Sequence, residues 1–156
     1  INYDSVIVES YLLQGDIICS FFQPVTKQTT LLLRGNVATK QTDNLVDNQA
    51  YRIGGLLSLR GFDEQSIYAS SYVIGTIEYR LLFDKLSRIS IFYDWSWYEL
   101  NSISKFVSDT PYAFGAGITF GTKAGLFSLN YAIGSQFNNP INFRTGKIHF
   151  GFVNIF

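Results

Sequence analysis

The sequence predicts an all-β fold, an antiparallel transmembrane β-barrel of which this chain forms about seven strands. Apolar and polar residues alternate with a period of two almost everywhere, which indicates strands with two different faces. The apolar face of each predicted strand is rich in aromatic residues, and short and long connections alternate along the chain. A soluble sandwich has two-faced strands as well, so the connections favour the membrane barrel over a sandwich or a lipocalin-like barrel.

The predicted strands follow one another with little interruption. In order they cover residues 6–22, 29–39, 72–83, 89–97, 112–120, 127–134 and 149–156. In the fourth of them Ile91, Tyr93 and Trp95 occupy one face, while Ser90 and Asp94 occupy the other. Most of the seven are long enough to cross a bilayer as tilted strands of ~9–11 residues.

Short connections are expected at 24–27, 84–87 and 121–125, and long ones at 41–70, 101–111 and 135–145. Outer-membrane barrels have this pattern of short periplasmic turns and longer extracellular loops. Seven strands cannot close such a barrel, because bacterial barrels have an even strand count and an open edge leaves backbone groups unpaired in lipid. We therefore expect residues 1–156 to be the C-terminal portion of a larger barrel, with an inward-folded loop at about 41–70.

Composition agrees with this class and excludes others. Charged residues make up 15% of the 156 residues, below the roughly 25% usual in soluble domains. The formal net charge is zero, so no broad field attracts nucleic acid. The sequence shows no apolar run of ~18 residues and no signal-peptide pattern. It begins with Ile and contains no Met, so we expect a mature or truncated piece of a longer protein.

Two isolated carboxylates, Glu78 and Asp94, lie on the inner face of successive predicted strands. Folding the hairpin about the turn at 84–87 makes them nearly cross-strand neighbours, which is destabilising unless a cation lies between them. Arg60, within the long connection, can supply that cation through charge-assisted hydrogen bonds. The alternative is that both acids face water in the lumen and that residues 59–62 form an exposed turn.

The neighbours of Arg60 suit a loop that folds inward. Gly61 lets the backbone approach closely or adopt a positive φ, and Phe62 can wedge against side chains of the inner face. Gly54 and Gly55 allow the returning chain to bend.

Paired carboxylates also occur in glycosidases, but no nucleophile or His accompanies these two, and an arginine between them holds both ionised. We therefore expect no catalytic residue, no cofactor and no enzymatic activity. Cys19 is interpreted as a small hydrophobic residue in an apolar strand, with a nucleophile or metal ligand as the alternative. His149 is isolated in the sequence, so no metal site is expected.

The run Gly54-Gly55 followed by Leu59-Arg60-Gly61-Phe62 resembles the signature loop of the outer-membrane assembly family, the BamA/TamA-like or bacterial surface antigen barrels. Leu59 departs from the usual Val or Ile. Glu78 and Asp94 resemble the two acidic positions that the loop arginine contacts in that family, while Ser96 replaces a frequent Gly. The resemblance implies a sixteen-stranded barrel.

The last strand resembles the assembly signal of barrel proteins, which has a polar residue, a glycine and a terminal aromatic. His149, Gly151 and Phe156 fit these positions, whereas Asn154 stands where an aromatic is common. The alternative for Phe156 is a simple lipid-facing aromatic.

The resemblance implies a protein of the cell outer membrane that inserts client outer-membrane proteins through a seam between its first and last strands, by β-augmentation. A two-partner-secretion pore and a passive outer-membrane channel or small adhesion barrel are the alternatives. The implied partners are outer-membrane lipid, client outer-membrane or secreted proteins, and the N-terminal barrel strands and POTRA modules of the same chain. No nucleic-acid partner is expected.

Overall fold

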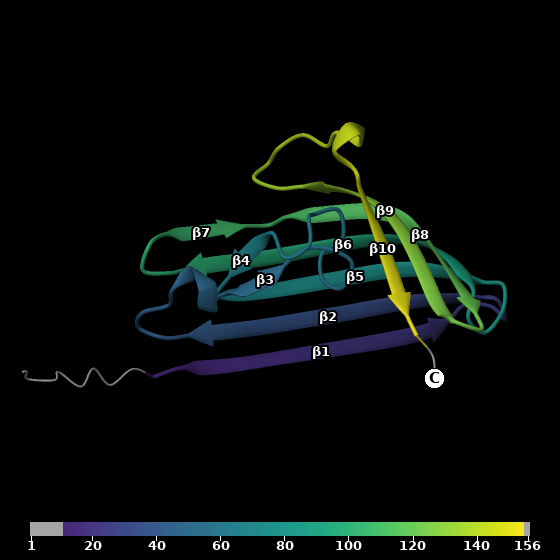
Figure 1. The fold of residues 1–156 in the computed structure, drawn as a ribbon, viewed down its shortest axis with the longest axis horizontal. Helices are drawn as coiled ribbons and strands as arrows, with labels where there is room; N and C mark the ends of the chain where they lie inside the picture. Colours follow the sequence, from purple (N-terminus) through teal and green to yellow (C-terminus); the bar gives the residue numbers. More distant parts are fainter. Residues whose placement is uncertain (1–10, 155–156) are drawn as a thin grey trace, which may run out of the picture.

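The computed structural model describes residues 11–154, which form one curved antiparallel sheet with a small hairpin on one of its faces (Figure 1). The sheet order is β1-β2-β5-β6-β8-β9-β10, with the short strand β7 paired to β6. The long strands are β1 (Leu13–Pro24), β2 (Thr29–Gln41), β5 (Ser71–Leu82), β6 (Arg88–Asn101), β8 (Tyr112–Thr122), β9 (Gly125–Ser135) and β10 (Lys147–Val153). The short ones are β3 (Tyr51–Ile53), β4 (Ile67–Ala69) and β7 (Phe106–Asp109).

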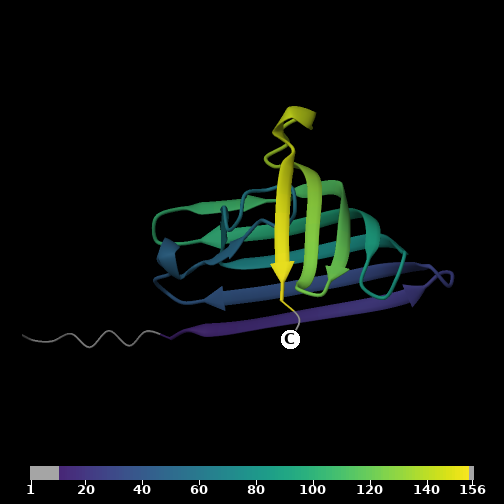
Figure 2. The same ribbon diagram turned by 45° about the vertical axis from the view of Figure 1, so that its right-hand side comes forward.

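The predicted all-β antiparallel class is confirmed, and the seven long strands correspond to the seven predicted ones. The sheet is not closed: β8, β9 and β10 turn steeply away from the direction of β1 and β2, as Figure 2 shows, so the sheet is a curved wall with two edges. The start of the first predicted strand and the terminal Phe156 lie outside the described residues. The three short strands were not predicted, because three or four residues are too few for a period of two to be visible.

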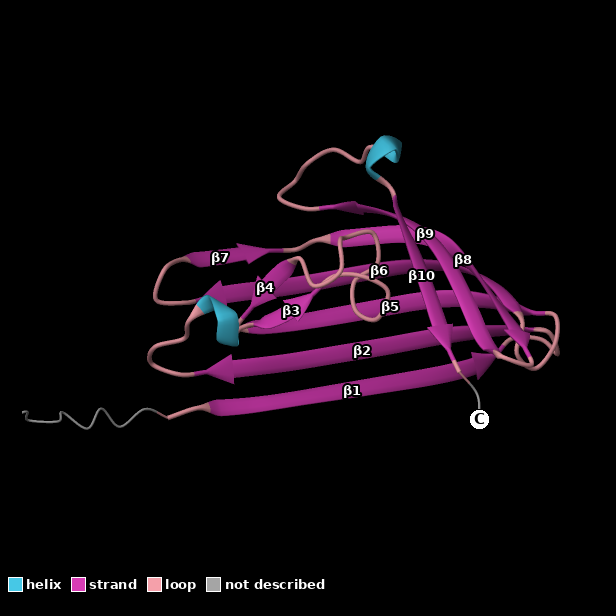
Figure 3. Cartoon of the chain, viewed as in Figure 1, coloured by secondary structure: helices cyan, strands magenta, loops and turns pink. Residues whose placement is uncertain are grey.

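In the part of the chain that the structure describes, helical structure is limited to two single turns, η1 (Asp47–Gln49) and η2 (Phe143–Thr145), both in long connections (Figure 3). Within residues 11–154 no helix is long and apolar enough to span a membrane. Short turns connect β1 to β2, β5 to β6 and β8 to β9, and the long connections lie at the opposite end of the sheet.

The two faces of the sheet differ in the way that the alternation predicts. On β6, Ser90, Phe92 and Asp94 are buried, while the intervening Ile91 and Tyr93 are exposed. We call the face of Asp94 the inner face, because the hairpin β3–β4 packs against it. The opposite, outer face carries most of the exposed aliphatic and aromatic side chains.

The register of the β5–β6 hairpin corrects one expectation. Glu78 pairs with Phe92 and Asp94 pairs with Thr76, so the two carboxylates are diagonal neighbours on the inner face rather than nearly opposite residues. The turn fixes this register, since Leu82 pairs with Arg88 and the backbone N–H of Phe83 donates to the carbonyl of Ser87. The true pairing is shifted by a single two-residue step, which keeps both acids on the same face.

An apolar core holds the hairpin β3–β4 against the inner face. Ile53, Leu59 and Ile67 of the hairpin and its loop are buried against Ile74 and Tyr98 of the wall. This burial brings residues 54–66, which we call the inward loop, into the concave side of the sheet.

Candidate functional site

Arg60, in the inward loop, binds carboxylates on two neighbouring strands. Its Nε and Nη2 donate to the two oxygens of Asp94 on β6, each over 2.7 Å, and its Nη1 donates to Oε2 of Glu78 on β5, also over 2.7 Å. The backbone N–H of Arg60 adds a 3.3 Å hydrogen bond to Oδ2 of Asp94. The arginine therefore binds Asp94 in a bidentate contact and Glu78 through a single hydrogen bond.

The guanidinium also lies on an aromatic ring. Its central carbon is 3.4 Å from the centroid of Phe92, the inner-face residue that pairs with Glu78. A delocalised cation on a ring face is a favourable arrangement. Gly115, on β8, leaves room for this ring, because a Cβ there would come within 2.8 Å of Phe92 Cζ.

The whole cluster is withdrawn from solvent, with Arg60 9%, Glu78 5% and Asp94 0% exposed. Burial alone lowers the pKa of the Arg60 guanidinium, but the hydrogen bonds and negative charges of Asp94 and Glu78 outweigh it, so the pKa lies above its ordinary value. Arg60 is therefore a permanent cation that forms ion pairs with both acids.

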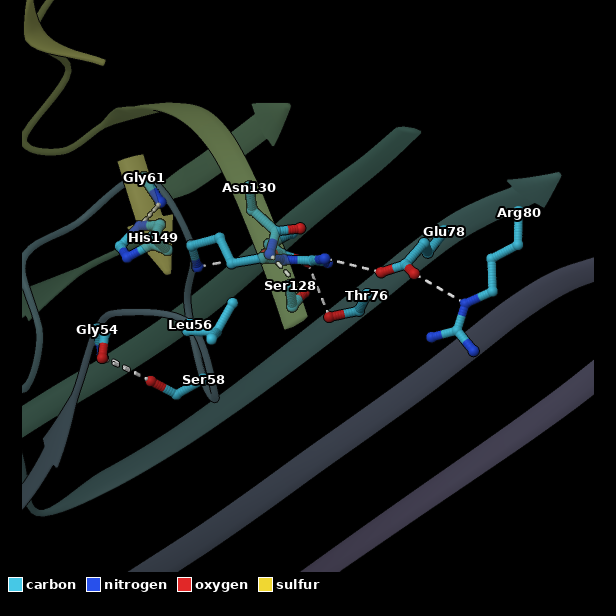
Figure 4. Close-up of polar contacts among 12 residues, drawn as sticks. Gly54, Leu56, Ser58, Gly61, Thr76, Glu78, Arg80, Ser128, Asn130 and His149 are labelled. Atoms are coloured by element: carbon cyan, nitrogen blue, oxygen red, sulfur yellow. Dashed lines mark hydrogen bonds and ion pairs between the residues drawn. The ribbon is translucent and has the colours of Figure 1, made fainter. Parts of the chain in front are cut away.

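Two further side chains complete the network around the carboxylates (Figure 4). Thr76 donates its hydroxyl to Oδ1 of Asp94 over 2.9 Å, and Arg80 donates its Nε to Oε1 of Glu78 over 2.8 Å. Each carboxylate oxygen thus accepts at least one hydrogen bond. A fully satisfied buried network of this kind favours one defined position of the loop.

Gly61 connects the inward loop to the last described strand. Its backbone N–H donates to Nε2 of His149 on β10 over 3.1 Å (Figure 4), and its φ is +87°. A Cβ at this position would lie 2.9 Å from the Cβ of Ala113, so glycine is required both by the φ value and by the close approach. Because Nε2 accepts, the proton of the neutral ring is assigned to Nδ1, which lies 3.6 Å from Oε1 of Glu64.

Other side chains of the inward loop pack over glycines of β9 and β10 or form an ion pair with β10. Phe62 covers Gly134 so closely that a Cβ there would meet its ring at 2.7 Å. Leu56 covers Gly151 in the same way, at 2.5 Å, and Lys147 forms a 2.8 Å ion pair with Asp63. Lys147, His149 and Gly151, alternate inner-face residues of β10, all contact the inward loop.

The structure brings together Leu59, Arg60, Gly61 and Phe62 with Glu78 and Asp94, and it adds His149 and Gly151 to the same site. Leu59 is fully buried in the core under the hairpin. Gly54 and Gly55 have φ values of +113° and +95° and form the bend at which the loop leaves β3. The predicted signal residue Phe156 lies outside the described residues.

Phe92, Thr76 and Glu64 were missed at the sequence level. Phe92 had a visible signal, since it is an aromatic between Ser90 and Asp94 on the polar side of an alternating strand. Glu64 had none: its Oε1 accepts from the backbone N–H of Leu56 over 2.7 Å, a contact that depends on the loop's shape.

Across residues 11–154, His, Cys, Asp and Glu side chains form no group of three that could hold a metal ion. Cys19 is exposed on β1, away from the inward loop.

Comparison with known proteins agrees with this architecture. The sequence model of the Omp85 superfamily domain matches residues 8–156, which covers the inward loop and every described strand. No curated protein matches the chain. The superfamily includes outer-membrane insertases and translocators. The match over nearly the whole length, together with the open antiparallel wall, shows that the chain belongs to the Omp85 superfamily of outer-membrane β-barrels.

Proposed function

We propose that this chain is the C-terminal wall of an insertase-type barrel, which receives strands of client outer-membrane proteins at a seam beside β10. The observation that supports the proposal most directly is the inward loop, which is bonded at once to β5, β6 and β10. A passive channel needs no such loop, whereas a barrel with a weak seam needs an internal support that keeps its wall in shape while the edge strand exchanges partners.

In this proposal each site residue has a structural role. Arg60, Glu78 and Asp94 fix the loop to the wall, and Gly61 and Phe62 carry it to β9 and β10. His149, Gly151 and Phe156 serve as the assembly signal of the unfolded chain. Once the chain is folded, His149 and Gly151 form the loop's binding surface on β10. The outer face contacts lipid, and the remaining barrel strands and POTRA modules belong to the same longer chain.

The test is Arg60→Ala in the full-length protein, expressed in its host while the wild-type copy is depleted. Removing one partner of a buried ion pair costs about 3–5 kcal/mol, so we expect the loop to detach and client outer-membrane proteins to decrease. Arg52→Ala is the matched control, because Arg52 lies exposed on β3 of the same hairpin, with its guanidinium over the Tyr68 ring.

Normal client levels in Arg60→Ala cells, with a normally folded barrel, would contradict the proposal. If export of a soluble client fails while membrane-protein assembly continues, the two-partner-secretion alternative is correct instead. Folding is followed separately by the difference in gel mobility between unheated and heated samples of the protein. A variant that does not fold is thereby distinguished from a folded variant that does not function.

A further inference from the structure

Beside the Arg60 network lies a second polar feature, a cavity of about 130 Å³ between the inward loop and the inner face. Leu56, Leu57 and Ser58 of the loop cover it, and β2, β5, β6, β8 and β9 supply its other walls. This volume is several times what one water molecule needs, which is enough for one small ion.

The cavity carries an excess of positive charge. Four arginines line it, Arg34, Arg60, Arg80 and Arg88, and Glu78 is the one carboxylate among its lining residues. Even when Asp94, bound to Arg60 just outside, is included, four guanidiniums face two carboxylates. Two positive charges are therefore uncompensated. Arg80 and Arg88 are half-buried, so water neutralises their charges less well than in bulk, whereas Arg34 is exposed.

The strand register places two of these positive charges, those of Arg80 and Arg88, next to each other. Arg80 pairs with Ser90 and Arg88 pairs with Leu82, so the two arginines are diagonal neighbours on the inner face, and like charges so placed repel. Within the described part of the chain, the buried Nε of Arg88 has no hydrogen-bond partner. An unmade hydrogen bond at a buried charged group is costly, and an anion in the cavity would remove both penalties.

We propose that this cavity binds a phosphate-class oxyanion, held by Arg34, Arg80 and Arg88. The guanidinium group matches such an oxyanion with parallel N–H donors. The three arginines come from three different strands and so approach the cavity from different directions. A tetrahedral oxyanion has acceptor oxygens in all directions and can bind all three, whereas a planar carboxylate has its carbon chain on one side. Ser90, Thr119 and Asn130 add neutral donors around the same space.

The experiment is calorimetric titration of the purified full-length protein in detergent with inorganic phosphate, against chloride at matched ionic strength. We expect saturable binding by the wild type, weakened about tenfold or more in both Arg88→Gln and Arg34→Gln, since each variant loses a hydrogen bond to a charged group. Arg144→Gln is the control, because Arg144 is an exposed residue of η2 that does not line the cavity, and its affinity should equal that of the wild type.

Absence of saturable binding to the wild type, or equal affinities in the wild type and the cavity variants, would overturn the proposal. If Arg88→Gln does not fold, Arg34→Gln decides, because Arg34 is an exposed residue of β2. A short-chain phosphatidic acid is titrated in parallel. Tighter binding of the lipid assigns the site to a headgroup phosphate, and tighter binding of the inorganic ion assigns it to free phosphate.

Discussion

The backbone N–H of Gly61 donates to Nε2 of His149 across 88 residues of sequence, so the loop that binds β5 and β6 also binds β10. The pair is buried, and a His in this position acts as a hydrogen-bond acceptor for the main chain. This contact gives a residue of the last strand a role that is independent of any signal in the unfolded protein.

His149→Leu should loosen the loop from β10, because it leaves the buried N–H of Gly61 without an acceptor, at a cost of about 1–3 kcal/mol. His149→Gln retains a carbonyl acceptor and should be closer to the wild type. The measurement is hydrogen exchange of the Gly61 amide, together with the melting temperature of the barrel. The latter is the temperature of preheating at which the folded band disappears from the gel. Equal exchange protection in His149→Leu and wild type would show that the contact contributes nothing.

The two acids of the Arg60 network should not be equivalent. Asp94 accepts from Nε, Nη2 and the backbone N–H of Arg60 and from Thr76, whereas Glu78 accepts one hydrogen bond from Arg60 and one from Arg80. Asp94→Asn turns an amide donor toward the guanidinium donors and should destabilise the barrel by about 3–5 kcal/mol.

Glu78→Gln, which disturbs fewer of these bonds, serves as the comparison and should cost less than Asp94→Asn. Chemical unfolding of the two variants in detergent compares them directly. A larger loss of unfolding free energy for Glu78→Gln would mean that the contacts of Glu78 with Arg60 and Arg80 contribute more than the bidentate contact of Arg60 with Asp94.

Gly61→Ala should destabilise the loop although it adds only a methyl group. The φ of +87° costs a non-glycine residue about 1–3 kcal/mol, and the new Cβ would lie 2.9 Å from both Ala113 Cβ and the backbone N of Gly134. Gly35→Ala is the matched control, since nothing lies within 4 Å of a Cβ there. The readout is again the melting temperature, and similar values for the two variants would contradict the close packing of the loop.

The β5–β6 turn should respond to acid through Asp84. Its Oδ1 accepts from the backbone N–H groups of Leu86 and Ser87, each over 2.7 Å, and the hydrogen bond from Leu86, followed by those from Ser87, lowers the pKa of this carboxyl. A pKa lowered by folding gives stability that is present above the unfolded pKa and is lost as the pH falls through the folded one.

Asp84→Asn should therefore lose this pH dependence while retaining an oxygen acceptor in the turn. The difference in unfolding free energy between wild type and variant is measured from neutral to acidic pH. A difference that stays constant over that range would show that the ionised carboxylate does not stabilise the turn.

The faces of the long strands could be read from the sequence because alternation reflects burial of one face, as it does on β5 and β6. The partners of Arg60 were predictable too, since two acids on one inner face require a cation. Their register was not, because it depends on the hydrogen bonds of Phe83 and Ser87 within the turn. The contact of Gly61 with His149 was beyond sequence reasoning, since it depends on the curvature that brings β10 to the loop.

The inward loop bridges β5 and β6 to β10 directly through its hydrogen bonds, while the wall connects the same strands through β8 and β9. In geometric terms the loop is a chord and the wall is its arc. A chord of fixed length sets the curvature of its arc, so this part of the barrel cannot flatten or open without breaking the bonds of Arg60 or of Gly61.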